Sequence, residues 1–84
     1  MTMSDPRRTP QILYIEDSDE SRSLVRRLLS KKYVVLEASD PLDGFQLAEE
    51  THPSLILLDS SLPHMSGSEA ATRLKKMLPK TPIV

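Results

Sequence analysis

The sequence predicts an α/β domain built on a parallel β-sheet, with an acidic site at the carboxyl edge of that sheet. Two short apolar runs, residues 12–15 and 55–58, lack the polar alternation of half-exposed strands and therefore indicate strands buried on both faces. Both runs end in carboxylates, Glu16 and Asp17 after the first and Asp59 after the second. Stretches with helical periodicity separate the strands, and this alternation with short connections is typical of right-handed crossovers in a parallel sheet.

The first strand is predicted at residues 11–15, after a polar lead-in of residues 1–10 that we expect to be disordered. Ser18 is a suitable N-cap, and the acidic residues that follow it favour the positive end of a helix dipole. The helix is expected to run to about Ser30. Its apolar residues recur at helical spacing and form one stripe: Leu24, Val25, Leu28 and Leu29.

The second strand and the second helix are predicted at residues 33–38 and 41–50. Asp40 is a strong helix start, because aspartate caps the free N–H groups and the proline after it fits the first helical position. Pro53 ends this helix, since the residue before a proline disfavours helical backbone. Its inward side chains are expected to be Leu42, Phe45 and Ala48, with Leu47 at the margin.

The third strand is predicted at residues 55–58, and a capping-box pattern from Ser66 to Glu69 predicts the start of a third helix. A fourth strand is expected to begin at residues 83–84. Two residues are few for a strand, so we expect the chain to be part of a longer domain. The inward stripe of the third helix is expected to be Ala70, Ala71, Leu74, Met77 and Leu78.

The composition excludes several classes of protein. The 84 residues include no cysteine, which excludes disulfides and thiolate metal sites and fits a reducing compartment, so we expect a cytoplasmic location. The 11 basic and 12 acidic residues nearly cancel, and we expect no direct nucleic-acid partner and no membrane partner. Arg22, Arg26 and Arg27 are interpreted as solvated charges, because aromatic residues are almost absent.

The three carboxylates predict a metal site. If the strands before Glu16 and Asp59 are parallel neighbours, then Glu16, Asp17 and Asp59 meet at one edge of the sheet, where ligands bind in open parallel sheets. Carboxylate oxygens favour Mg²⁺, Mn²⁺ or Ca²⁺ over Zn²⁺, and a shallow site with few ligands favours Mg²⁺. Acidic residues at strand ends also cap helices, so the spacing alone leaves both interpretations open.

The motifs around these carboxylates resemble the receiver domain of two-component response regulators. The resemblance rests on the acidic pair Glu16-Asp17, on Asp59, and on the stretch Leu62-Pro63-His64-Met65-Ser66-Gly67. Leu62, Pro63, Met65 and Gly67 fit the family's usual pattern, whereas Ser66 stands where an aspartate is usual. The similarity covers residues 11–84, which we interpret as one receiver domain that stops at the start of the fourth strand.

The resemblance implies a flavodoxin-like doubly wound sheet with strand order 2-1-3-4, in which the fifth strand and the last two helices are absent. Asp59 is then the phosphoacceptor, Asp17 a direct Mg²⁺ ligand, Glu16 a ligand through water, and Ser61 a ligand through its backbone carbonyl. The implied function is to accept a phosphoryl group from a histidine kinase or a phosphotransfer protein. Such a domain is a regulatory phosphoacceptor rather than a conventional enzyme.

The sequence departs from a complete receiver in ways that leave a second function open. In this family the switch Ser/Thr follows the fourth strand and the lysine follows the fifth. Both positions lie beyond the basic and hydroxyl residues near the end of this chain, which are Lys75, Lys76, Lys80 and Thr81. The first helix would be alone on its face of the sheet, so we expect self-association through the exposed face or edge. The alternative is a phosphorylation-independent interaction or dimerisation module; an Asp-x-Asp phosphatase and a flavin-binding flavodoxin fit the motifs less well.

Overall fold

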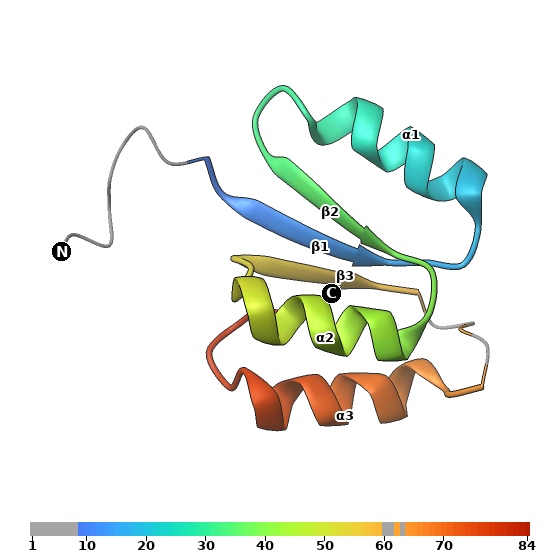
Figure 1. Ribbon diagram of the computed structural model, residues 1–84, viewed down its shortest axis with the longest axis vertical. Helices are drawn as coiled ribbons and strands as arrows, with labels where there is room; N and C mark the ends of the chain where they lie inside the picture. Colours follow the sequence, from blue (N-terminus) through green and yellow to red (C-terminus); the bar gives the residue numbers. More distant parts are fainter. Residues whose placement is uncertain (1–8, 60–61, 63) are drawn as a thin grey trace, which may run out of the picture.

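The computed structural model describes residues 9–59, 62 and 64–84, and these residues form two helical layers around a parallel sheet. Figure 1 shows α1 on one face of the sheet and α2 and α3 side by side on the other. The strand order in the described part of the chain is β2-β1-β3, which confirms the predicted arrangement. The elements are β1 (Gln11–Ile15), α1 (Asp19–Leu29), β2 (Val34–Ala38), α2 (Pro41–Thr51), β3 (Leu55–Leu58) and α3 (Gly67–Met77).

A fourth strand begins beside β3, as the sequence predicts. Ile83 forms a parallel bridge with Ile56, and the N–H of Val84 donates to the carbonyl of Ile56 at 2.9 Å. The N–H of Leu58 donates in turn to the carbonyl of Val84 at 3.0 Å. In the described part of the chain this pairing is one isolated bridge, because only Ile83 and Val84 follow Pro82 in the sequence.

The hydrophobic core lies on the α2 and α3 side of the sheet. Leu13 and Ile15 of β1 and Ile56 of β3 point to this side and are fully buried. Alternate residues of a strand point to opposite faces, so the same register sends Ile12, Tyr14 and Leu57 toward α1. The other buried members of the core cluster are Ala38, Ala48, Leu62, Ala70, Leu74 and Leu78.

The helices begin where the sequence predicts. The side chain of Ser18 accepts a hydrogen bond from the N–H of Ser21 at 3.2 Å, and that of Ser66 accepts from Glu69 at 3.1 Å. Asp40 caps α2 in the same way. No helix among the described residues is long and apolar enough to cross a membrane.

The α1 face of the sheet is thinly covered in the part of the chain that the structure describes. Leu24 is 55% exposed and Leu28 is 70% exposed, so half of the predicted apolar stripe of α1 faces solvent. Beside α1 lies an apolar groove of about 300 Å³. We call it the α1-side groove; it is lined by Pro10, Ile12, Leu29, Tyr33, Ser54, Leu55 and Leu57.

The inward face of α2 differs from the prediction at Leu42, which is 68% exposed. The buried residues of α2 are Pro41, Gly44 and Ala48, at spacings of three and four that define one face of a helix. Leu42 lies about 100° around the helix from Pro41 and therefore points away from the sheet. Phe45 and Leu47 do pack against the core, as predicted.

Gly44 is expected to be essential for the packing of α2 on β1. A Cβ atom at position 44 would lie 2.4 Å from Cδ1 and 2.8 Å from Cγ1 of Ile15, whose side chain is fully buried. Overpacking of this kind costs about 1–3 kcal/mol and outweighs the gain of about 1 kcal/mol in helix propensity. Gly44→Ala should therefore lower the free energy of unfolding measured in urea.

The matched test of this contact is the double variant Gly44→Ala with Ile15→Val, which removes the Cδ1 atom that collides. We expect the second substitution to cost less in the Gly44→Ala background than in the wild type. Strictly additive losses, or a Gly44→Ala variant more stable than the wild type, would contradict the proposed clash.

Candidate metal site at the carboxyl edge of the sheet

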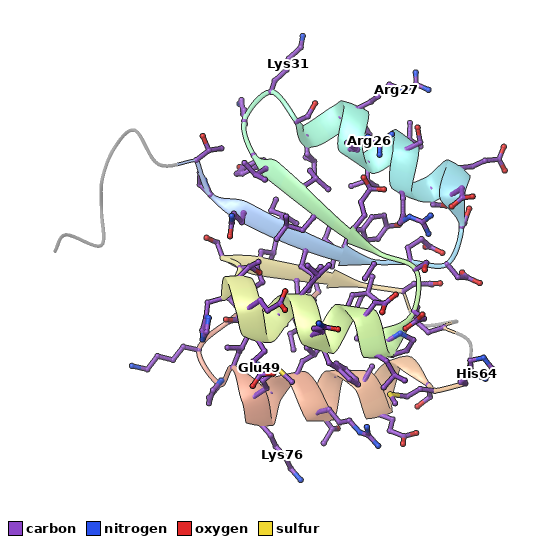
Figure 2. The ribbon with its side chains drawn as sticks, in the orientation of Figure 1. Arg26, Arg27, Lys31, Glu49, His64 and Lys76 are labelled. Carbon is purple, nitrogen blue, oxygen red and sulfur yellow. The ribbon has the colours of Figure 1, made fainter. Side chains whose placement is uncertain are left out.

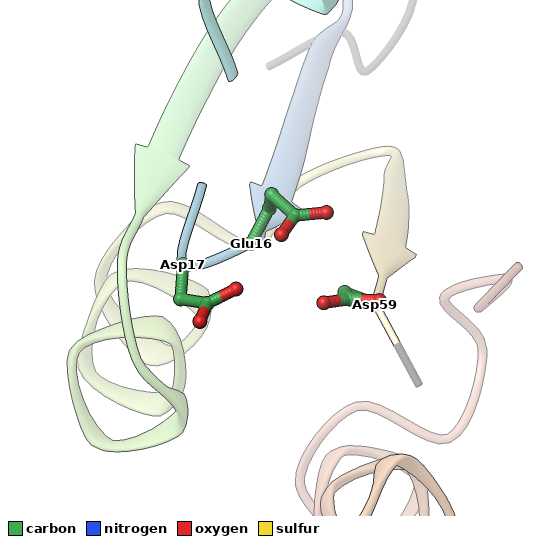
Figure 3. A group of neighbouring side chains, drawn as sticks. All are labelled: Glu16, Asp17 and Asp59. Atoms are coloured by element: carbon green, nitrogen blue, oxygen red, sulfur yellow. The ribbon is translucent and has the colours of Figure 1, made fainter. Parts of the chain in front are cut away.

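The carboxylates of Glu16, Asp17 and Asp59 meet at the ends of β1 and β3 (Figure 3). Each offers one oxygen atom, and these oxygens all lie within 4.8 Å of one another. The backbone explains the juxtaposition, because Ile15 and Leu58 are paired in register and the N–H of Asp59 donates to the carbonyl of Ile15 at 3.1 Å. Parallel pairing of the two strands thus brings together residues that are distant in the sequence, as predicted.

The carboxylate of Glu16 is held by two donors from its own segment. The hydroxyl of Tyr14 donates to Oε1 at 3.2 Å, and the N–H of Ser18 donates to Oε2 at 3.1 Å. Our sequence interpretation did not assign Tyr14 to the site. The signal was available, because residues two apart on a strand lie on the same side of the sheet.

Burial raises the pKa of the Glu16 carboxyl above its ordinary value of 4.5, and the nearby Asp17 and Asp59 carboxyls raise it further. Hydrogen bonds from Ser18 and Tyr14 act in the opposite direction. Since the folded chain holds this proton more tightly than the unfolded chain, the contribution of Glu16 to stability falls as the pH rises through the raised pKa. Burial, the hydrogen bond to Glu16 and the carboxylates of Glu16 and Asp59 also raise the pKa of Tyr14.

The donor set fits a hard divalent cation. Clustered carboxylates repel one another, and a cation such as Mg²⁺ relieves that repulsion while it keeps several of its waters. Asp17 is exposed and the other two carboxylates are half-buried, so the cluster is open to water on one side. Glu16, Asp17 and Asp59 could thus hold the metal, whereas Ser61, expected to offer its carbonyl, lies outside the described residues.

The loop after Asp59 is anchored at its described positions. Leu62 is buried in the core cluster and Met65 packs against that cluster. His64 is exposed and has a φ of 67°, a left-handed conformation that histidine tolerates better than most residues do. Figure 2 shows its side chain at the outer rim of the molecule.

Arg22 corrects the interpretation of the α1 arginines as solvated charges. Its side chain is only 14% exposed, and its guanidinium donates to the backbone carbonyl of Glu16 at 2.6 Å. It also pairs with the carboxylates of Asp19 and Glu37. Arg26 is 52% exposed and fits the prediction better, although it too pairs with Glu37. The pair of Arg22 with Asp19 could have been predicted, because residues three apart in a helix are neighbours on its surface.

In a comparison with protein families, the model of the response regulator receiver domain matches residues 12–84. The chain is 34% identical over 77 residues to the autoinducer 1 sensor kinase/phosphatase LuxN of Vibrio harveyi, covering 90% of this chain and 9% of that protein. It is 36% identical over 75 residues to the transcriptional regulatory protein SrrA of Staphylococcus aureus, covering 88% of this chain and 31% of that protein.

Solved structures show the same likeness. The signal receiver domain of an HD domain-containing protein from Pseudomonas fluorescens superposes with a TM-score of 0.85 at 26% identity, covering 90% of this chain and 62% of that chain. A CheY-like receiver domain protein from Methanospirillum hungatei gives a TM-score of 0.87 at 25% identity, covering 90% and 62%. The chain is therefore shorter than the receivers that it matches, and it spans a small part of the curated relatives.

Proposed function

This chain belongs to the response regulator receiver domain family, and we propose that it accepts a phosphoryl group on Asp59 in two-component signalling. The partner is a histidine kinase or a phosphotransfer protein that carries phosphohistidine. The observation that carries the proposal is the cluster itself, in which oxygens of Glu16, Asp17 and Asp59 lie within 4.8 Å of one another. Within this family such a cluster is expected to serve phosphotransfer. The phosphorylated domain then carries the signal, and repeated conversion of a substrate is not required.

In the proposed step, a carboxylate oxygen of Asp59 forms a bond to phosphorus as the bond from phosphorus to the histidine nitrogen breaks. The nitrogen keeps the electron pair of that bond, and the product on this chain is an acyl phosphate. Asp17 and Asp59 would hold Mg²⁺ directly and Glu16 through water, and Ser61 is the proposed carbonyl ligand. Bound Mg²⁺ supplies positive charge that stabilises the phosphoryl oxygens.

A small phosphodonor tests this function without knowledge of the partner. Phosphoramidate carries the same phosphorus–nitrogen bond as phosphohistidine, so the chain with Mg²⁺ should gain one phosphoryl group detectable by intact mass. Asp59→Asn should show no adduct, and removal of Mg²⁺ with a chelator should suppress the adduct in the wild type. A folded wild-type chain that gains no phosphoryl group, or an Asp59→Asn variant that gains it equally, would contradict the proposal.

A second candidate function, interaction through a second copy, is favoured by the exposed α1 face. Leu24 and Leu28 lie on the same side of the sheet as the α1-side groove, and exposed apolar surface of this kind promotes association. We therefore expect the apparent mass in size-exclusion chromatography with light scattering to rise with concentration. Leu28→Lys should reduce this association.

Leu42→Lys is the matched control, because Leu42 is similarly exposed but lies on α2, on the other face of the sheet. Association through the α1 face predicts that Leu42→Lys behaves as the wild type does. A monodisperse monomer at high concentration, or equal effects of the two lysine substitutions, would contradict this second function.

A further inference from the structure

Arg22 is the α1 side chain that reaches into the turn carrying the acidic cluster. Helix α1, all of which is described, contains no fully buried residue, yet the side chain of Arg22 is only 14% exposed. A guanidinium held this far from water needs several partners, because its charge and its five N–H groups must be satisfied. The partners of Arg22 therefore indicate what the residue does.

Three acceptors surround the guanidinium. One nitrogen, Nη1, donates to the carbonyl oxygen of Glu16 at 2.6 Å, and Nη2 bonds the carboxylate of Asp19. The remaining nitrogen, Nε, lies 3.4 Å from Oε1 of Glu37 on β2. The carboxylates of Asp19 and Glu37 thus balance the charge of the planar guanidinium. Its third contact is to a backbone atom of the metal site, the carbonyl oxygen of Glu16.

This contact completes the restraint of Glu16. Its N–H donates to the carbonyl of Ala38 at 3.0 Å, and its two carboxylate oxygens accept from Tyr14 and Ser18. The carbonyl that Arg22 holds belongs to the planar peptide group that joins Glu16 to Asp17. Rotation of that peptide would move the Asp17 carboxylate relative to Asp59, so a restraint on the carbonyl is a restraint on the geometry of the cluster.

We propose that Arg22 is a positioning residue of the metal site, which locks the peptide between Glu16 and Asp17 so that their carboxylates converge with Asp59. The proposal rests on the metal site put forward above and adds a residue that lies outside it. Arg22 acts through the backbone carbonyl, and Asp19 and Glu37 keep its charge engaged away from the carboxylate oxygens that would face a cation.

Metal affinity distinguishes positioning from simple electrostatics by the sign of the effect. Removal of a positive charge near an anionic site strengthens cation binding through Coulomb's law. Loss of positioning weakens cation binding, because the carboxylates then sample orientations that do not converge. A variant that removes the arginine charge and binds the cation less tightly is therefore explained by positioning and not by charge.

Arg26 provides the matched control. It lies one turn further along α1, and its Nη1 is 2.6 Å from Oε2 of the same Glu37. Its side chain is 52% exposed, and the part of the structure that is described gives it no hydrogen bond to Glu16. Arg26→Met therefore removes one positive charge and one contact to Glu37, as Arg22→Met does, but leaves the contacts of Arg22 to Asp19 and to the Glu16 carbonyl in place.

The experiment titrates the 84-residue chain and its variants with Mn²⁺ and measures the free ion by electron paramagnetic resonance, well below each melting temperature. We expect Arg22→Met to bind Mn²⁺ about tenfold more weakly than Arg26→Met, within the range typical of groups that orient metal ligands. Arg22→Lys should fall between Arg22→Met and the wild type, since one ammonium cannot reach all three acceptors.

Equal or tighter binding by Arg22→Met than by Arg26→Met would overturn the proposal while leaving the metal site intact. A folded wild type that binds no Mn²⁺ would overturn both the metal site and the role of Arg22. If Arg22→Met does not fold, Arg22→Lys is compared with Arg26→Lys. Weaker Mn²⁺ binding by Arg22→Lys then supports the proposal, and equal binding overturns it.

Discussion

Replacement of Asp17 by Asn is expected to weaken Mg²⁺ binding by about 100-fold. A group that only hydrogen-bonds to a metal ligand already contributes roughly 10–100-fold to metal affinity. Asp17 is proposed to contact the ion directly, so its loss should cost at least as much. Asn keeps the size of the side chain but removes the charge that a hard cation prefers. Isothermal titration calorimetry, or displacement of Mn²⁺ by Mg²⁺, measures the affinity.

Asp43→Asn is the control for the charge change. Asp43 is an exposed acidic residue in the first turn of α2 and is not part of the carboxylate cluster. Its replacement should leave the Mg²⁺ affinity within about twofold of the wild type, because solvent and salt screen an exposed charge that is not one of the proposed metal ligands. Similar affinities for Asp17→Asn and Asp43→Asn would show that Asp17 is not a ligand.

Leu13→Ala is expected to remove a large share of the free energy of unfolding. Leu13 is fully buried at the centre of β1, the middle strand, and truncation of a buried leucine to alanine costs about 2–5 kcal/mol. A chain of 84 residues has a total stability of roughly 4–13 kcal/mol, so the loss is a large share of the whole. Circular dichroism in urea measures the change.

Leu28→Ala is the comparison variant, because Leu28 has the same side chain but is mostly exposed. Its replacement should change the free energy of unfolding by less than about 0.5 kcal/mol. If Leu13→Ala cost no more than Leu28→Ala, the core would not lie on the α2 and α3 side of the sheet.

The backbone arrangement could be predicted because its signals are local. Ser18, Asp40 and Ser66 each precede a run with helical spacing, and the structure places each as the N-cap of a helix. Continuous apolar runs mark β1 and β3, and parallel order follows from the intervening helices. The meeting of Glu16, Asp17 and Asp59 could be predicted for the same reason, because parallel strands end at one edge of the sheet.

The partners of individual side chains could not be predicted in this way. The pairing of Arg22 with Glu37 depends on how α1 lies across β2, which no spacing in the sequence records. The exposure of Leu42 depends on which face of α2 contacts the sheet, and a small residue at position 44 decides that face through its approach to Ile15. Hydrophobicity alone favours burial of leucine and does not predict a close contact such as that between Gly44 and Ile15.

The assignment of Asp59 as the phosphoacceptor can be tested by chemistry that locates acyl phosphates along the chain. Borohydride reduces a phosphorylated aspartate to homoserine, and peptide mass spectrometry after treatment with phosphoramidate and Mg²⁺ identifies the converted residue. We expect homoserine at position 59 and unchanged aspartates at positions 17, 40 and 43. Conversion at another aspartate, or no conversion in a folded chain that binds Mg²⁺, would contradict the assignment of Asp59 as the phosphoacceptor.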